Sequence, residues 1–134
     1  MFSSYGTLRY VGAKLIVEAD QGVADYYRSL IPKWYVIQPQ KYRAHISVVR
    51  KEGPQHMEFW GKYEGEQVQF VYDSEIKHGG LYWWLDCYSL RLEEIRLELG
   101  LTLSSRFEPP QAPFLKRFHM TLANNKRSPH ETFS

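Results

Sequence analysis

The chain has 134 residues, of which 43% are hydrophobic, 16% aromatic and 24% charged, and its formal net charge is +2. This composition is typical of one soluble globular domain, residues 1–134, and a small basic excess indicates no particular partner. A single cysteine, Cys87, excludes an internal disulfide and any multi-cysteine zinc motif. No apolar run approaches the roughly 18 residues of a membrane span, and no basic-then-apolar leader is present. We therefore expect a cytoplasmic protein without a membrane partner.

The first half of the chain is predicted to contain strands and short helices. Residues 5–18 alternate between apolar and polar, which predicts a strand or a bent strand pair. Asp20 is placed to cap a helix over residues 21–30, and a strand rich in β-branched residues follows at 42–51. A short helical segment is expected at 57–60.

The second half is predicted to add three strands, one helix and a loop. We expect a strand at 67–73, a turn at 78–80, a strand at 81–88, a helix at 90–99 that Gly100 ends, a loop at 104–113 and a strand at 117–123. Strands joined by hairpin turns, with two modest helices, favour an α+β fold with antiparallel sheets.

Two five-residue segments share one pattern. Residues 44–48 read Ala-His-Ile-Ser-Val and residues 118–122 read Phe-His-Met-Thr-Leu, so both are apolar-His-apolar-hydroxyl-apolar. Because side chains alternate along a strand, His45 and Ser47 share one face of the first, and His119 and Thr121 one face of the second. A single such tripeptide is weak evidence, since most strand histidines are packed or solvated. Two matched copies favour a shared chemical role.

Phosphodiester chemistry matches this pair of imidazoles. One proton leaves the attacking oxygen and another reaches the leaving oxygen, and two histidines perform both transfers without a metal or cofactor. The two hydroxyls are suited to donate hydrogen bonds to the non-bridging phosphate oxygens. Eight basic residues within eight positions of a motif histidine would attract an anion, although solvated strand ends explain them as well: Lys41, Arg43, Arg50, Lys51, Lys116, Arg117, Lys126 and Arg127.

The doubled motif resembles that of the two-histidine (2H) phosphoesterase superfamily, over residues 5–123. The resemblance implies two pseudo-symmetric lobes of antiparallel sheet with flanking helices around a central cleft. It also implies that His45 and His119 are the acid–base pair and that Ser47 and Thr121 bind the phosphate. No metal site is expected.

Three segments are similar to the bacteriophage anti-CBASS nucleases of that superfamily: Tyr-Gly-Thr-Leu-Arg-Tyr at 5–10, Tyr-Arg-Ala-His-Ile-Ser-Val-Val-Arg at 42–50 and Glu-Ile-Arg-Leu-Glu-Leu-Gly-Leu at 94–101. This likeness implies hydrolysis of the 3′–5′ bonds of cyclic di- and trinucleotide immune signals in the cytoplasm of a bacterial host. A ribose 2′-hydroxyl would attack the adjacent phosphate. The motifs themselves do not assign the acid and the base between the histidines.

Two aromatic residues are predicted to contact the substrate. We place Tyr10 on the polar face of the first strand, from which it would stack on or hydrogen-bond a nucleotide. Alternation puts Trp83 in the core and Trp84 on the histidine side, where an indole would stack on a base. Packing or surface roles are the alternatives for both.

Other functions remain compatible with the sequence. The same histidine pair would serve a phosphodiesterase acting on RNA ends or 2′–5′ oligonucleotides. A non-catalytic module that sequesters cyclic nucleotides would need the aromatic and basic residues but not two matched imidazole–hydroxyl pairs. The modest charge argues against long nucleic acid as a partner.

Overall fold

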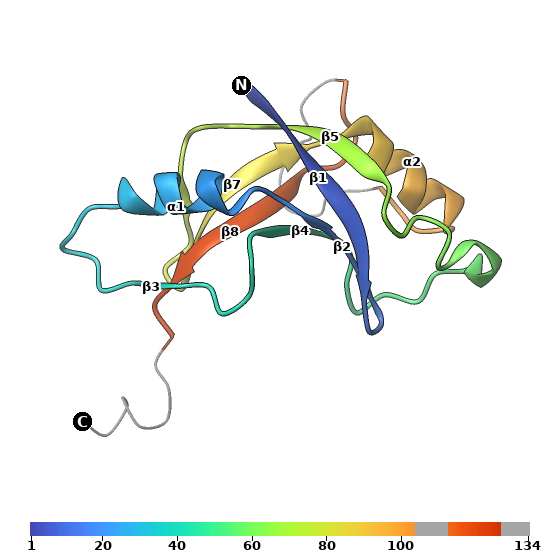
Figure 1. The fold of residues 1–134 in the computed structure, drawn as a ribbon, viewed down its shortest axis with the longest axis horizontal. Coiled ribbons are helices and arrows are strands. Elements are labelled where there is room, and N and C mark those ends of the chain that lie inside the picture. The colour runs from blue at the N-terminus through green and yellow to red at the C-terminus, as the bar shows by residue number, and fades with distance from the viewer. Residues whose placement is uncertain (104–112, 127–134) are drawn as a thin grey trace.

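A computed structural model describes residues 1–103 and 113–126, and it confirms an α+β fold with antiparallel strand pairing. The elements in chain order are β1 (Phe2–Val11), β2 (Lys14–Glu18), α1 (Gln21–Ser29), β3 (Gln38–Pro39), β4 (His45–Val49), the 3-10 helix η1 (Met57–Phe59), β5 (Gln67–Tyr72), β6 (Lys77–His78), β7 (Tyr82–Tyr88), α2 (Leu90–Glu98) and β8 (Phe118–Asn124) (Figure 1). Two of these, β3 and β6, are two-residue strands that the sequence pattern does not predict. The predicted loop at 104–113 lies almost entirely outside the described residues.

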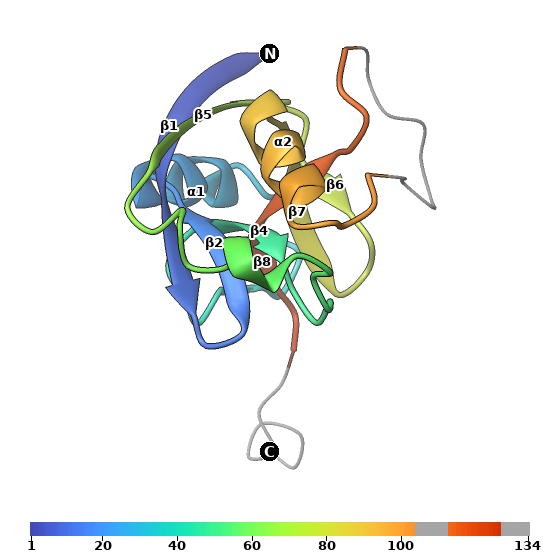
Figure 2. The ribbon, with the colours of Figure 1, turned by 90° about the vertical axis from the view of Figure 1, so that its right-hand side faces the viewer.

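Six of the strands form one closed ring. Each pairs with the next in the order β1, β2, β4, β8, β7 and β5, and β5 pairs back onto β1. The short strands lie beside the ring, β3 on β8 and β6 on β7. Figure 2 shows β1 and β2 on one side of this ring and β7 on the other. The strands thus make one continuous ring instead of two separate sheets.

The inner face of the ring is the hydrophobic core. The register puts buried aliphatic residues side by side, as in Leu8↔Val17, Val17↔Ile46 and Ile46↔Met120. A six-stranded ring is narrow, so side chains fill its interior. The two helices lie toward opposite ends of the molecule (Figure 1) and add Ala24, Leu92 and Ile95 to the same core. Side chains of opposite parity therefore point outward, and these include the motif histidines.

A tight hairpin joins β1 to β2. Val11 pairs with Lys14, so the turn contains only Gly12 and Ala13, and Gly12 adopts a φ of +60°. Glycine at the first central position is typical of a two-residue hairpin of type II′. The turn interrupts the alternation predicted for residues 5–18, and Tyr10 pairs with the buried Leu15 instead of sharing a face with outward residues. The expected position of Tyr10 on the polar face is wrong.

The helix boundaries follow local signals. The Asp20 carboxylate accepts a hydrogen bond from the Gly22 amide at 2.9 Å, which confirms the predicted cap of α1. At α2 the Ser89 hydroxyl accepts from the Leu92 amide, and Gly100 ends the helix with a φ of +78°. In the described part of the chain, neither helix has the length and apolar character needed to cross a bilayer.

Candidate functional site

Strands β4 and β8 bring the two histidine motifs together. They pair antiparallel with Ile46 opposite Met120, and both of these side chains are fully buried. Extending this register by one residue places His45 opposite Thr121 and Ser47 opposite His119. Cross-strand partners point to the same side of a sheet, so all four side chains lie on the outer face of the ring. Their partial or full exposure agrees with this placement.

The four groups are related by a local two-fold axis. An axis between Ile46 and Met120 superimposes His45 on His119 and Ser47 on Thr121. Each imidazole therefore lies beside the hydroxyl of the other motif. The two histidines are diagonal neighbours, a relation that separates residues by about 7–8 Å in antiparallel sheets. A separation of this size leaves room for a single phosphate group between the two rings.

The symmetry extends to a carboxylate beside each imidazole. On the edge of β4 away from β8, Glu18 of the neighbouring β2 lies opposite His45. On the edge of β8 away from β4, Asp86 of the neighbouring β7 lies opposite His119. The two acids differ in environment, because the Glu18 side chain is 43% exposed and that of Asp86 is 4% exposed. Each histidine thus lies between a hydroxyl and a carboxylate, although only one carboxylate is shielded from water.

The ring of His45 is oriented by a backbone carbonyl just before its strand. Its Nδ1 atom lies 2.8 Å from the Arg43 carbonyl oxygen. A carbonyl oxygen only accepts, so Nδ1 carries a hydrogen. The nitrogen left for a substrate is therefore Nε2.

His119 is accessible to solvent yet densely surrounded by protein atoms. This partial desolvation is the main cause that lowers its pKa, and the positive charges of His45, Arg117 and Arg50 lower it further, whereas the Asp86 carboxylate opposes them. The net effect favours a neutral imidazole at neutral pH. That the charge of His45 lowers the pKa of His119 agrees with their diagonal placement.

Asp86 is a buried acid that the motif pattern does not identify. Its Oδ1 atom accepts a hydrogen bond from the Trp84 indole nitrogen at 3.1 Å and lies 3.3 Å from Nε of Arg117. Arg117 immediately precedes β8 and shares the outer face with His119. An aspartate inside an otherwise apolar strand, two residues after Trp84, is the sequence signal that points to this position.

Of the two aromatic residues predicted to contact substrate, only Trp84 lies on the histidine face. It pairs with Thr121 and is half-buried, whereas Trp83 is 3% exposed and stacks on His78. The distant edge of the indole lies over Gly79, where a Cβ would meet it at 3.2 Å. Tyr10 instead packs against Trp60 on the core side, and its hydroxyl accepts from the Gly61 amide at 2.8 Å. Tyr10 is not brought near the histidines.

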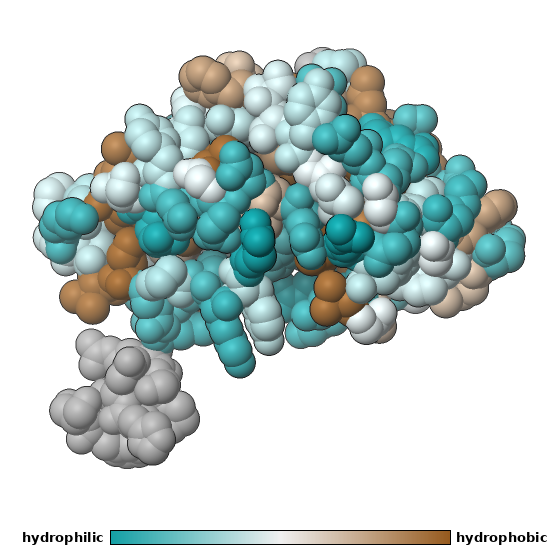
Figure 3. All heavy atoms as spheres, viewed as in Figure 1, coloured by the Kyte–Doolittle hydropathy of each residue, from teal (hydrophilic) through white to brown (hydrophobic). Residues whose placement is uncertain are grey.

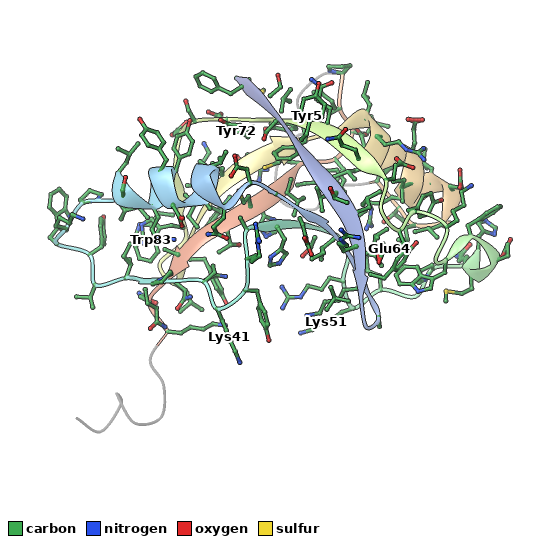
Figure 4. The ribbon with its side chains drawn as sticks, viewed as in Figure 1. Tyr5, Lys41, Lys51, Glu64, Tyr72 and Trp83 are labelled. Atoms are coloured by element: carbon green, nitrogen blue, oxygen red, sulfur yellow. The ribbon has the colours of Figure 1, made fainter. Side chains whose placement is uncertain are left out.

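Basic residues flank β4 at both of its ends. Figure 4 shows Lys41, which precedes the strand, and Lys51, which follows it, both extending from the lower edge of the molecule. At the other strand, Lys116 and Arg117 come immediately before β8. Of the eight basic residues near the motifs, Arg127 lies outside the described residues. Cations thus lie at the ends of both motif strands, and two basic residues, Arg50 and Arg117, act electrostatically on His119, which favours anions there.

The hydrophobic side chains and the hollow that the surface shows lie away from the histidine motifs. The view in Figure 3 is largely hydrophilic, and hydrophobic side chains gather at its left end, over the segment between α1 and β3. A surface hollow beside α1 is lined by residues such as Arg28, Lys33 and Gln38, and includes none of the motif residues. Within residues 1–103 and 113–126, no three His, Cys, Asp or Glu side chains form a cluster suited to a metal ion.

Comparison with known proteins gives no relative. No family model, no curated protein and no solved structure matches this chain.

Proposed function

We propose that the protein is a phosphodiesterase that cleaves 3′–5′ phosphodiester bonds with His45 and His119 as its proton-transfer groups and without a metal. The observation that carries this proposal is the pairing of Ile46 with Met120, which places two imidazoles and two hydroxyls on one face with two-fold symmetry. Cleavage of a phosphodiester also has two proton transfers to fill, one from the attacking oxygen and one to the leaving oxygen. Two proton-transfer groups on opposite sides of one phosphate serve this reaction.

The reaction in this proposal is an intramolecular transfer. A ribose 2′-hydroxyl attacks the adjacent phosphorus while its proton passes to one histidine. The bond from phosphorus to the 5′-oxygen breaks, and the other histidine gives that oxygen a proton. The Ser47 and Thr121 hydroxyls donate hydrogen bonds to the non-bridging oxygens, where negative charge grows in the transition state. The products are a 2′,3′-cyclic phosphate and a 5′-hydroxyl.

Cyclic di- and trinucleotides are the substrates that we propose. Support comes from the resemblance to the anti-CBASS nucleases and from the half-buried Trp84 beside Thr121, which offers an indole for stacking. The cations at the ends of β4 and β8 would hold the phosphates of a compact anion. The role that follows is the removal of immune signals in the cytoplasm of a bacterium infected by a phage.

The two-lobed arrangement of the 2H superfamily belongs to the same proposal. In this interpretation the two lobes correspond to two halves of the ring, one with β4 and the other with β8. The local two-fold axis between Ile46 and Met120 would be their pseudo-symmetry axis.

The test is incubation of the protein with a panel of cyclic di- and trinucleotides in excess EDTA, followed by chromatography. Wild type is expected to release linear products. His45→Ala and His119→Ala should each lose about 10²–10⁴-fold in rate while still binding ligand. His56→Ala is the matched control, because His56 is an exposed histidine outside both motifs. Full activity in both motif variants would refute the assignment.

The same panel separates the alternatives. Tight binding without cleavage would favour a sequestering module. If the protein neither binds nor cleaves these nucleotides, RNA ends and 2′–5′ oligonucleotides are the substrates to test next.

A further inference from the structure

The outer face that carries the histidine motifs continues along β7 and β8 beyond Thr121. Trp84 lies opposite Thr121, and Tyr82, two residues earlier on β7, shares the face of Trp84. The register of β8 shifts between these two positions, so that Asn124 lies opposite Tyr82. Asn124 therefore belongs to the histidine face, although simple alternation from Thr121 would turn it inward.

Asn124 ties the end of β8 to the β3 segment through three side-chain amides, Gln38, Gln40 and Asn124, which we call the amide cluster. The Oδ1 atom of Asn124 accepts from Gln38 Nε2 at 2.9 Å and from the Lys126 backbone amide at 3.0 Å. Gln38 Nε2 also donates to the Lys126 carbonyl, and Asn124 Nδ2 donates to Gln40 Oε1. Because a backbone amide only donates and a carbonyl only accepts, these contacts fix the orientation of all three amides. The atom of Gln40 that is left for a ligand is therefore Nε2, a donor.

Lys126 is held in place on this face. Both of its backbone groups are bound by the amide cluster, and its ammonium lies 5.0 Å from the centre of the half-buried Tyr82 ring. No carboxylate of residues 1–103 and 113–126 forms an ion pair with Lys126. The Lys126 ammonium and Gln40 Nε2 both offer hydrogen-bond donors, and one of them is a cation. Such a pair of groups is suited to an anion.

This second row of side chains lies close to the proposed site of cleavage. Leu85 of β7 pairs with Met120, at the centre of the four motif groups, and Tyr82 is three residues away on the same strand. At about 3.3 Å per residue, the row of Tyr82 lies roughly 10 Å from that centre. The lysine ammonium is carried on a flexible four-carbon stem that can bring it nearer. A phosphate between the histidines and a second one at Lys126 would therefore fit within one compact ligand.

We propose that Lys126 and Gln40 bind the second phosphate of a cyclic dinucleotide while the first lies between the two motif histidines. This assignment rests on the proposed phosphodiesterase function and names the part of the substrate that the second row recognises. A cyclic dinucleotide carries two phosphates on one ring. A linear dinucleoside monophosphate has the same two bases but only the phosphate that is cut. The site at Lys126 thus favours the cyclic substrate over the linear one.

The test compares these two substrates. Wild type and variants would be given, in EDTA, the cyclic dinucleotide that wild type cleaves fastest and the linear 3′–5′ dinucleoside monophosphate with the same bases. Lys126→Met should raise KM for the cyclic substrate about tenfold with little change in kcat, and should leave the linear substrate unaffected. Lys126→Arg, which keeps the charge, should stay near wild type. Lys14→Met is the matched control, because it removes the same charge from an exposed position beside the β1–β2 turn.

Gln40→Leu should act in the same direction as Lys126→Met by a smaller factor, and no effect would exclude Gln40 from the site. Equal losses with both substrates, or no loss with either, in Lys126→Met would overturn the assignment of the second phosphate. If wild type cleaves the linear substrate but no cyclic one, the assignment fails while the phosphodiesterase activity stands. If wild type cleaves neither substrate, the phosphodiesterase function itself fails, so the two failures are distinguishable.

Discussion

Replacement of Arg96 by Met is expected to destabilise the strand that carries His45 and Ser47. The Arg96 side chain is 2% exposed and donates to the Val48 carbonyl at 2.7 Å and to both carboxylate oxygens of Glu52 at 2.8 and 2.7 Å. Removing one partner of a buried ion pair costs about 3–5 kcal/mol. Because the Glu52 side chain is 34% exposed, water offsets part of this, and we expect a loss of about 3 kcal/mol. For a chain of this length that corresponds to a fall in Tm of roughly 10 °C.

Arg91 of the same helix provides a matched control. It also binds a glutamate through two nitrogens, at 2.6 and 2.9 Å, and that partner, Glu66, is 34% exposed like Glu52. Arg91 itself is 35% exposed, so Arg91→Met should cost at most about 1 kcal/mol. Urea and thermal unfolding followed by circular dichroism would measure both. Equal losses for the two variants would refute the role assigned to the burial of Arg96.

Three further predictions concern the pH dependence of stability, the hydroxyl of Thr121 and the indole of Trp84. The hydrogen bonds from Arg96 lower the pKa of Glu52, so the stability they contribute is present at neutral pH and is lost as pH falls through the folded-state pKa. The difference in unfolding free energy between wild type and Arg96→Met should therefore become smaller in acid. A difference that does not change with pH would contradict this. Thr121→Val should reduce kcat by about 10–100-fold in the cleavage assay, whereas Thr121→Ser, which keeps the hydroxyl, should stay near wild type. Trp84→Ala should weaken ligand binding by about 1–3 kcal/mol in titration calorimetry, and Trp84→Phe, which keeps an aromatic ring, should weaken it by less. Equal affinities of wild type and Trp84→Ala would exclude stacking on this indole.

The strands of the site and both helices could be predicted from the sequence, because each carries its own local signal. Alternation at residues 44–48 and 118–122 correctly placed the two motif histidines and both hydroxyls outward, since the intervening residues are buried. Asp20 marked the start of α1 and Gly100 the end of α2, in agreement with the structure. Local periodicity was sufficient wherever one residue in two is buried against the core.

Other features depend on contacts that local patterns do not encode. Alternation was extended through residues 5–18, but the two-residue turn at Gly12 breaks it, and Tyr10 therefore packs on Trp60 instead of facing a ligand. The closure of the ring by β5 on β1 pairs residues from Thr7↔Gln67 to Phe2↔Tyr72, which are 60 to 70 positions apart, and neither strand predicts this pairing alone. The short strands β3 and β6 contain too few residues to show a period.

The surroundings of His119 show most clearly why motif and mechanism are separate levels of prediction, and Asp86→Asn tests their effect on this histidine. The Asp86 carboxylate raises the pKa of His119 against desolvation and the neighbouring cations. Its removal should lower that pKa further, so the limb of the kcat/KM profile that reports His119 should move to lower pH, whichever of the two proton transfers this histidine performs. Glu18→Gln, at the symmetric position beside His45, should leave that limb in place. If instead Glu18→Gln moves this limb and Asp86→Asn does not, the Asp86 carboxylate does not control the protonation of His119, and this reasoning is wrong.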